Sequence, residues 1–452
     1  MRKVLNRILL LMRPPRFAAR ALVRTAGASS KTVGSSVKQF RKVVFWMHLV
    51  TAVSAALVIL LMSVTGVLLT YQRQITAWAD VRGLDAGPPA PGAPPLAPDA
   101  LLARVTAAHP GRPTTLKWFA DAQAPAQVAF GREKTLFVSA YTGQVLSEGH
   151  TGVRAFFRKV VALHRWVGAE GENRELGKKI SGAANLLFLF LVVSGFYLWF
   201  PRNWTRAAFR NVAWFRRGLT PRARDFNWHH VIGFWSAVPL FVIVLSGVVI
   251  SYPWASALVY RAVGETPPPP PAEGRAPGAA AAAGGPAAAR GGERGERGGG
   301  DAEKPVPLEG IGVLAARAER QVEGWRSITL TLPKEAAEPI AFAIDRGDGG
   351  QPQKRAQLAL DPATGAVTKW EPFPSQTAGR RLRSILRFAH TGEVLGIPGQ
   401  TLAGLVSLGA AFLVWTGLAL TWRRFRQWRA PRRTATPSRR REPLEEAETV
   451  GV

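Results

Sequence analysis

The chain has 452 residues, 47% of them hydrophobic, and a formal net charge of +29. It contains no cysteine, which excludes disulfide bonds, thiolate metal sites and cysteine-bound iron–sulfur clusters. The charge could indicate nucleic-acid binding, but 27 basic and only 5 acidic residues gather in the segments 1–42, 201–228 and 423–452. Because these segments flank long apolar runs, membrane topology explains the charge, and we expect no nucleic-acid partner.

Four apolar runs, each of about 20 residues or more, contain no Lys, Arg, Asp or Glu. They are Val43–Tyr71, Ile180–Phe200, Val231–Tyr252 and Leu402–Trp422. Runs of this length and composition predict helices that cross a lipid bilayer. The three basic segments share one side of the membrane if all four helices cross it, so we expect both termini in the cytoplasm.

The chain also contains an internal repeat. A histidine within the first run, and one just before the third, is followed by a glycine after 18 residues and by a tyrosine after 23, namely His48, Gly66, Tyr71 and His229, Gly247, Tyr252. The second and fourth runs correspond as well. Each is preceded by a histidine and ends in a similar string, namely His164 with Ser194-Gly195 and His390 with Thr416-Gly417. The repeat predicts a duplicated chain of two halves.

Each half has a long connection between its two spans, on the side away from the cytoplasm. The first, about 72–155, has a helical pattern over 99–108, then strand-like runs at 127–130, 135–139 and 144–146. The second, about 307–375, repeats that order, with a helix near 308–322 and strands at 327–331, 340–344, 357–360 and 366–370. We therefore expect one small α+β domain in each half. Residues 265–306 are rich in Pro, Ala and Gly and are predicted to be a disordered insert.

Five histidines lie at the predicted ends of the spans. His48, His229 and His230 lie on the cytoplasmic side, and His164 and His390 on the opposite side. A lone histidine at such a place is commonly an ordinary interfacial residue, but four at equivalent positions of a repeat form two pairs, one near each membrane face. Two imidazoles that face each other across a helix bundle can hold a b-type haem through both axial positions.

Arginines near these histidines are candidates for binding haem propionates. Arg383 and Arg387 lie seven and three residues before His390, on the same face of a helix, and Arg165 adjoins His164. Basic residues flank membrane spans for topological reasons as well, so this interpretation stays open.

Several strings resemble the PepSY-associated transmembrane family, which includes iron-regulated inner-membrane proteins and ferrisiderophore reductases. They are Leu163-His164-Arg165-Trp166, His229-His230-Val231-Ile232-Gly233 and His390-Thr391-Gly392-Glu393-Val394-Leu395-Gly396-Ile397-Pro398-Gly399. The resemblance covers roughly residues 38–428. It implies an α-helical protein of the bacterial inner membrane, in which four transmembrane helices form two span–PepSY–span repeats with two small periplasmic α+β domains.

The resemblance also implies two haem b groups, held by the family histidines. These map onto His48 with His229 and onto His164 with His390, and His230 is the alternative ligand to His229. One departure is that the first span reads His48-Leu49-Val50, where the family often has His-Arg-Trp.

The activity implied is electron transfer to ferric siderophores, or to another Fe(III) chelate, in the periplasm during iron acquisition. The basic residues Arg154, Arg158, Lys159 and Arg380–Arg387 are candidates for substrate contacts. The cytoplasmic segments have 42, 28 and 30 residues, too few for a flavin or nicotinamide domain, so an external reductase or a membrane quinol is expected to donate electrons. The alternative is a non-enzymatic PepSY membrane protein that binds or regulates a periplasmic partner such as a peptidase. A transporter is disfavoured because the spans carry no acidic residue at the midplane.

The expected segments are, in chain order, a basic N-terminus (1–38), the first span (43–71), PepSY-like domain 1 (72–155), a pre-helix with the second span (156–200), a basic loop (201–228), the third span (229–252), PepSY-like domain 2 with its insert (253–378), a pre-helix with the fourth span (379–422) and a basic tail (423–452).

Overall fold

The computed structural model describes residues 16–131, 134–200, 205–269, 310–333, 335 and 338–429, with the backbone alone for residues 16–37. The basic tail from 430 onward and residues 270–306 of the predicted insert lie outside the described residues.

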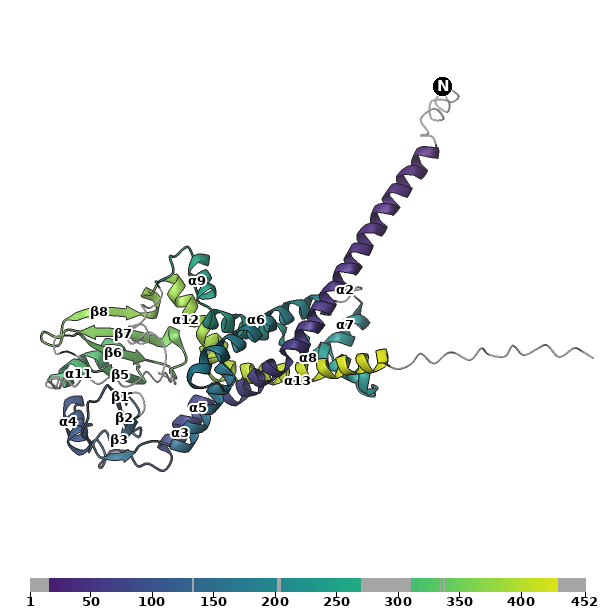
Figure 1. Cartoon of the computed structure of the whole chain (residues 1–452). Helices are drawn as coiled ribbons and strands as arrows, with labels where there is room; N and C mark the ends of the chain where they lie inside the picture. The colour runs from purple at the N-terminus through teal and green to yellow at the C-terminus, as the bar shows by residue number, and fades with distance from the viewer. Residues whose placement is uncertain are drawn as a thin grey trace, which may run out of the picture.

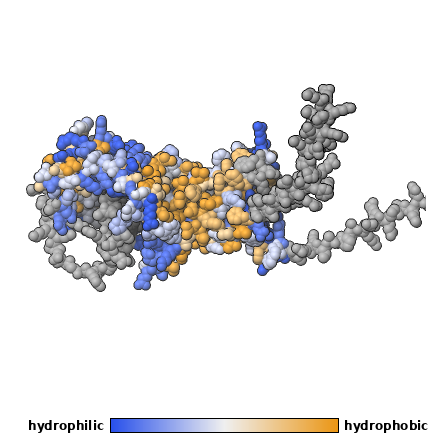
Figure 2. Space-filling view, turned by 90° about the horizontal axis from the view of Figure 1, so that it is seen from above, coloured by the Kyte–Doolittle hydropathy of each residue, from blue (hydrophilic) through white to orange (hydrophobic). Residues whose placement is uncertain are grey.

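Four long helices form one bundle, with α2 beside α6, α6 beside α8, α8 beside α13 and α13 beside α2. They are α2 (Arg16–Leu69), α6 (Arg174–Trp199), α8 (Pro221–Ser251) and α13 (Gly396–Arg429). All four have apolar windows long enough to cross a membrane. Figure 2 shows the hydrophobic surface around the bundle, between hydrophilic regions at its two ends. The chain is therefore a membrane protein with four candidate spans, as the sequence predicts.

The two predicted α+β units share a single antiparallel sheet at one end of the bundle, hereafter the sheet end (Figure 1). Its strand order is β4-β3-β2-β1-β5-β6-β7-β8. The strands are β1 (Thr115–Phe119), β2 (Ala126–Phe130), β3 (Lys134–Val138), β4 (Val145–Ser147), β5 (Ser327–Thr331), β6 (Ile340–Asp345), β7 (Arg355–Leu360) and β8 (Val367–Pro372). Strands β1 and β5 belong to different halves of the chain and pair from Thr115↔Thr331 to Phe119↔Ser327. The sequence predicts seven of these strands and misses β1, and the two expected α+β units are joined in one shared sheet.

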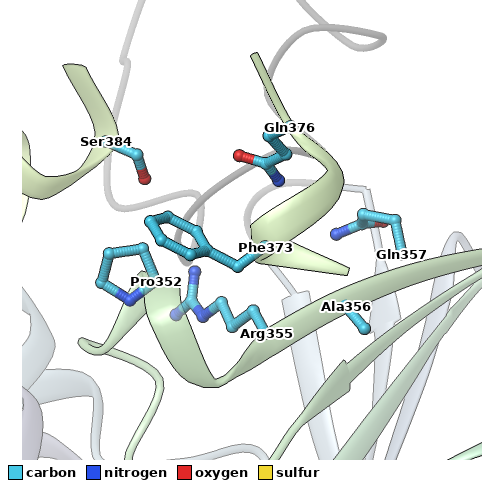
Figure 3. A pocket seen from close by; sticks show the side chains of 7 residues that line it. All are labelled: Pro352, Arg355, Ala356, Gln357, Phe373, Gln376 and Ser384. Carbon is cyan, nitrogen blue, oxygen red and sulfur yellow. The ribbon is translucent and has the colours of Figure 1, made fainter. Parts of the chain in front are cut away.

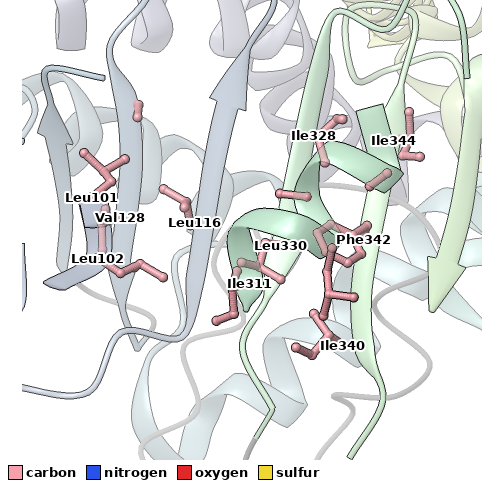
Figure 4. Packing of buried hydrophobic residues seen from close by; sticks show 14 of the residues in the cluster. Leu101, Leu102, Leu116, Val128, Ile311, Ile328, Leu330, Ile340, Phe342 and Ile344 are labelled. Atoms are coloured by element: carbon pink, nitrogen blue, oxygen red, sulfur yellow. The ribbon is translucent and has the colours of Figure 1, made fainter. Parts of the chain in front are cut away.

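Two helices cover one face of this sheet, α4 (Pro98–Ala108) and α11 (Ile311–Gln321). Apolar side chains alternate along the strands toward these helices, and Leu116, Leu330 and Phe342 are at most 1% exposed. The two helices and strands of both halves contribute to one hydrophobic core (Figure 4). The core therefore joins the two halves, in addition to the strand pairing.

Shorter helices connect the sheet to the bundle. They are α3 (Gln72–Val81), α5 (Thr151–Trp166), α9 (Pro253–Ala262) and α12 (Ala378–His390), while α7 (Arg206–Ala213) lies at the opposite end of the bundle. Four 3-10 turns complete the described elements, namely η1 (Gly171–Asn173), η2 (Pro352–Lys354), η3 (Phe373–Ser375) and η4 (Glu393–Leu395). Helix α5 packs on α2 and α6, and α12 packs on α8 and α9. These two helices are the predicted pre-helices, and both lie against the bundle.

A carboxylate holds the beginning of each pre-helix. Asp80 accepts hydrogen bonds from the backbone N–H of His150 at 2.7 Å and from the Arg154 guanidinium at 2.9 and 2.7 Å. In the second half, Glu265 accepts from the Thr377 side chain and from the first backbone N–H groups of α12, and these hydrogen bonds lower the pKa of Glu265. The ionised Glu265 therefore stabilises the beginning of α12 at neutral pH. Its contribution to the free energy of unfolding is lost as the pH drops through that lowered pKa.

We expect Asp80→Asn to lower the free energy of unfolding by about 2 to 3 kcal/mol, because it leaves the half-buried Arg154 without its carboxylate. Chemical denaturation of the detergent-solubilised protein measures the effect. Glu148→Gln is the matched control: it breaks the exposed Lys134–Glu148 pair and should cost less than about 1 kcal/mol. Equal losses in the two variants would contradict a role for Asp80 in holding α5.

Candidate functional site

Two of the predicted histidines lie toward the end of the bundle opposite the sheet. His48 projects from α2, and its Nδ1 lies 2.8 Å from Oγ of Ser194 on α6. His229 projects from α8, and its Nδ1 lies 2.9 Å from Oγ1 of Thr416 on α13. Each ring therefore bridges two helices of the bundle, and the repeat places the two rings in equivalent surroundings. We call His48 and His229 the opposite-end pair.

The other two histidines form the sheet-end pair. His164 on α5 has its Nδ1 2.9 Å from Oγ1 of Thr65 on α2. His390 on α12 has its Nδ1 2.8 Å from the carbonyl oxygen of Ile243 and 3.4 Å from Oγ of Ser246, both on α8. The sequence analysis placed these histidines just before the second and fourth spans. The structure shows that they reach the first and third spans, because the pre-helices turn back onto α2 and α8.

The sheet-end rings lie close together. Their centroids are 6.3 Å apart, and the ring planes are inclined by 60°. Two imidazoles bound to opposite sides of one metal have centroids about 6 Å apart, if each metal–nitrogen bond is about 2 Å. The described residues contain no group of three or more His, Asp or Glu that could hold a bare metal ion. A site with two protein ligands fits a metal whose remaining positions are filled by a macrocycle, as in haem.

The two pairs lie near opposite ends of the bundle. On α2, His48 and Gly66 are 18 residues apart, and Gly66 lies beside the ring of His164. Eighteen residues make about five helical turns and rise about 27 Å, so both positions lie on the same face of the helix. This rise is close to the thickness of a hydrocarbon core, about 30 Å. Along α2, the two pairs are therefore separated by about the thickness of a hydrocarbon core.

A family model described as the PepSY-associated TM region matches residues 45–424. The chain belongs to the PepSY-associated transmembrane family. The match includes all four histidines of the two pairs and both parts of the shared sheet. No curated protein matches the chain.

In this PepSY-associated protein, His230 lies in different surroundings from those of His229. Its Nδ1 lies 2.9 Å from the carbonyl oxygen of Phe226, one turn earlier in its own helix. Its ring also packs on the Phe226 ring, with the centroids 4.0 Å apart. Neither contact has a counterpart in the other half, so the repeat favours His229 over His230 as a ligand.

The three predicted propionate-binding arginines have different surroundings. Arg165 lies within electrostatic range of both His164 and His390, and its guanidinium lies 5.3 Å from the Trp166 ring centre. Arg387 lies over Phe388 at 5.7 Å. The Nε of Arg383 instead donates to Ser256 of α9 at 2.8 Å. Arg165 is therefore the best placed of the three to contact an anionic group beside the sheet-end pair.

The family string after His390 forms a tight loop, which the sheet contacts. Gly392 has φ +74°, and a Cβ there would lie 2.2 Å from the Gly399 carbonyl oxygen, so only glycine fits. Glu393 accepts a hydrogen bond from Arg73 of α3 at 2.9 Å, and Arg73 also donates to the carbonyl oxygen of Asp348. Sequence analysis missed Arg73, because its partners lie more than 270 residues away. Through these two hydrogen bonds, Arg73 links the sheet to the loop that follows His390.

A small hollow lies between β7 and α12 (Figure 3). It is lined by Pro352, Arg355, Ala356, Gln357, Phe373, Gln376 and Ser384. None of the four paired histidines lines it, so we do not assign it to the site. Burial lowers the pKa of Arg355, although the nearby Asp345 carboxylate, 3.0 Å from Nε, opposes that shift.

Proposed function

We propose that this membrane protein carries electrons across a bacterial inner membrane and reduces ferric siderophores, Fe(III) to Fe(II), on the periplasmic side during iron acquisition. The observation that carries the proposal is the arrangement of four histidines from both halves as two pairs, with the rings of the sheet-end pair 6.3 Å apart. Membership of the PepSY-associated family, which covers this whole region, supports it.

The proposed cofactors are two haem b groups, one held by His48 with His229 and the other by His164 with His390. A haem at each pair would supply a one-electron carrier whose iron alternates between Fe(III) and Fe(II). The protein's own part is to hold the rings at both ends of the bundle. Ala55, Ala56 and Ile59 of α2 are buried in the bundle between these ends.

The orientation is inferred from charge. Arg206, Arg210, Arg216, Arg222 and Arg424 are described at the end opposite the sheet, and segments at that end carry most of the excess basic charge of the sequence. The positive-inside rule places this end in the cytoplasm and the sheet in the periplasm. An external reductase or a quinol then supplies electrons at the cytoplasmic end.

The proposed substrate is reduced by one electron while its chelating ligand stays intact. Siderophores bind Fe(III) far more tightly than Fe(II), so the reduced iron is released. Of the basic residues predicted to contact substrate, Arg154 is bound by Asp80, and Arg380 forms an ion pair with Glu371. Arg158 and Lys159 of α5 are exposed and remain the candidates for contact with an anionic chelate.

The visible spectrum of detergent-purified protein, expressed with haem available, tests the proposal. A Soret band with sharp reduced α and β bands, at two haems per chain, is the expected result. The protein reduced with dithionite and freed of excess reductant should then be reoxidised by ferric siderophores, but not by the gallium chelates, which cannot accept an electron. A folded but colourless protein would refute the proposal and favour the non-enzymatic alternative, binding of a periplasmic partner.

A further inference from the structure

Every one of the four paired histidines lies against the same dipeptide, a hydroxyl residue followed by glycine. These hydroxyl–glycine pairs are Ser194-Gly195 beside His48, Thr65-Gly66 beside His164, Thr416-Gly417 beside His229 and Ser246-Gly247 beside His390. We propose that they are ligand-positioning units, which fix the tautomer of each histidine and leave room for its ring. The inference deepens the proposed function and rests on it.

The hydroxyl groups are placed to accept hydrogen bonds from the rings, because their own protons have acceptors on the preceding helical turn. Thr65 Oγ1 donates to the carbonyl oxygen of Leu61 at 2.6 Å, Ser194 Oγ to that of Phe190 at 2.7 Å and Thr416 Oγ1 to that of Phe412 at 2.8 Å. Each oxygen then offers a lone pair to the histidine Nδ1. We therefore assign the proton of each of these three rings to Nδ1.

The ring of His390 also has its proton assigned to Nδ1, but on the evidence of a different acceptor. Its Nδ1 lies 2.8 Å from the carbonyl oxygen of Ile243, and a carbonyl oxygen can only accept. Ser246 Oγ donates to the same carbonyl at 2.8 Å and lies 3.4 Å from Nδ1. At this site the carbonyl is the main partner of the ring, and the hydroxyl is secondary.

A neutral imidazole with its proton on Nδ1 has a lone pair only on Nε2. All four histidines therefore present the same nitrogen as the potential metal ligand, with Nδ1 held against a neighbouring helix. Outer partners of this kind orient a metal-binding histidine and increase its basicity. A histidine buried for structural reasons needs only one satisfied nitrogen, but nothing in that role requires the same dipeptide four times.

The second member of each pair is glycine, and the missing side chain leaves space for the histidine ring. A Cβ added at Gly195 or Gly247 would lie 3.2 Å from Cε1 of His48 or His390, tighter than ordinary van der Waals contact. A Cβ added at Gly417 would lie 3.5 Å from Cε1 of His229, and one added at Gly66 would lie 3.8 Å from Cε1 of His164. Any larger side chain at the first two positions would push the ring away from the helix. At His48 and His390 the dipeptide thus combines a polar contact with close approach, whereas at Gly417 and Gly66 a Cβ would meet the ring at ordinary contact distance.

The test replaces one hydroxyl with an isosteric methyl group. Thr416→Val removes the acceptor for His229, Thr416→Ser retains it, and Thr421→Val is the matched control. Thr421 lies on the same helix and donates to Gly417 O at 2.8 Å, but no contact with a histidine is recorded for it among the described residues. The readouts are haem stoichiometry, the rate of haem transfer to excess apomyoglobin, and the reduced α band.

We expect Thr416→Val to weaken haem retention at one site by about 10- to 100-fold and to alter its α band. Thr416→Ser and Thr421→Val should behave as the wild type does. If Thr416→Val does not fold, judged by circular dichroism and gel filtration, Thr65→Val at His164 provides the same comparison. A variant with wild-type stoichiometry, transfer rate and spectrum would overturn the positioning role alone. A wild-type protein without haem would refute the proposed function itself.

Discussion

His390→Ala is expected to reduce the haem content of the purified protein from two per chain to one. The reason is that the sheet-end pair has only two rings, 6.3 Å apart, and the described residues place no third His, Asp or Glu with them as a substitute ligand. His48→Ala should remove the other haem and leave the sheet-end site filled. The pyridine haemochrome assay measures the stoichiometry, and the residual spectrum identifies which haem remains.

His230→Ala is the control for these losses. It removes an adjacent imidazole of the same helix, but that imidazole bonds to Phe226 of its own helix rather than to α13. We expect this variant to keep both haems. If His48→Ala and His390→Ala both retained two haems, the assignment of the pairs would be wrong. If His230→Ala lost one haem and His229→Ala lost none, the ligand would be His230 and not His229.

Leu330→Ala is expected to lower the free energy of unfolding by about 2 to 5 kcal/mol, which is the usual cost of removing a large aliphatic side chain from a packed core. Leu330 lies on β5, is 0% exposed, and is paired with Leu116 of β1 at the junction of the two halves. Both pre-helices follow directly from this sheet. We therefore expect the sheet-end haem to be released at a lower temperature, before the opposite-end haem.

Val313→Ala is the comparison for this effect. Val313 lies on α11, which covers the same sheet, but its side chain is 73% exposed. The variant should therefore unfold within about 0.5 kcal/mol of the wild type. Thermal scans that follow the Soret band and the far-ultraviolet circular dichroism separate haem release from unfolding. Simultaneous release of both haems in Leu330→Ala would show that the sheet does not support one site in particular.

The spans and seven of the eight described strands could be predicted because their signals are local, whereas β1 was not predicted. Runs without charge identify α6 and α13, and alternation of apolar and polar residues identifies strands such as β5 and β6. The pairing of β1 with β5 could not be predicted, since alternation tells which face of a strand is buried but not which strand lies beside it. More than 200 residues separate Leu116 from Leu330, and that separation leaves no sequence pattern.

The histidines of the site could be predicted from the repeat, but their supporting residues could not. Gly66 and Gly247 occupy matching positions in the repeat, but the hydroxyl residues that precede them, Thr65 and Ser246, give no local signal of their role. Their role depends on rings that reach them from α5 and α12, helices distant in sequence. Arg73 gives no local signal for the same reason. In each case the residues in contact are close together in the fold but far apart along the chain.

Each histidine pair takes one member from each half, His48 with His229 and His164 with His390. A polypeptide that contained one half alone could complete neither site, whereas two copies of such a polypeptide, joined edge to edge along the strand equivalent to β1 or β5, could complete both. The duplicated chain is in this sense a covalent form of a symmetric dimer. Co-expression of the halves as separate polypeptides, divided in the loop between α7 and α8, should therefore reassemble a coloured complex that neither half forms as a monomer.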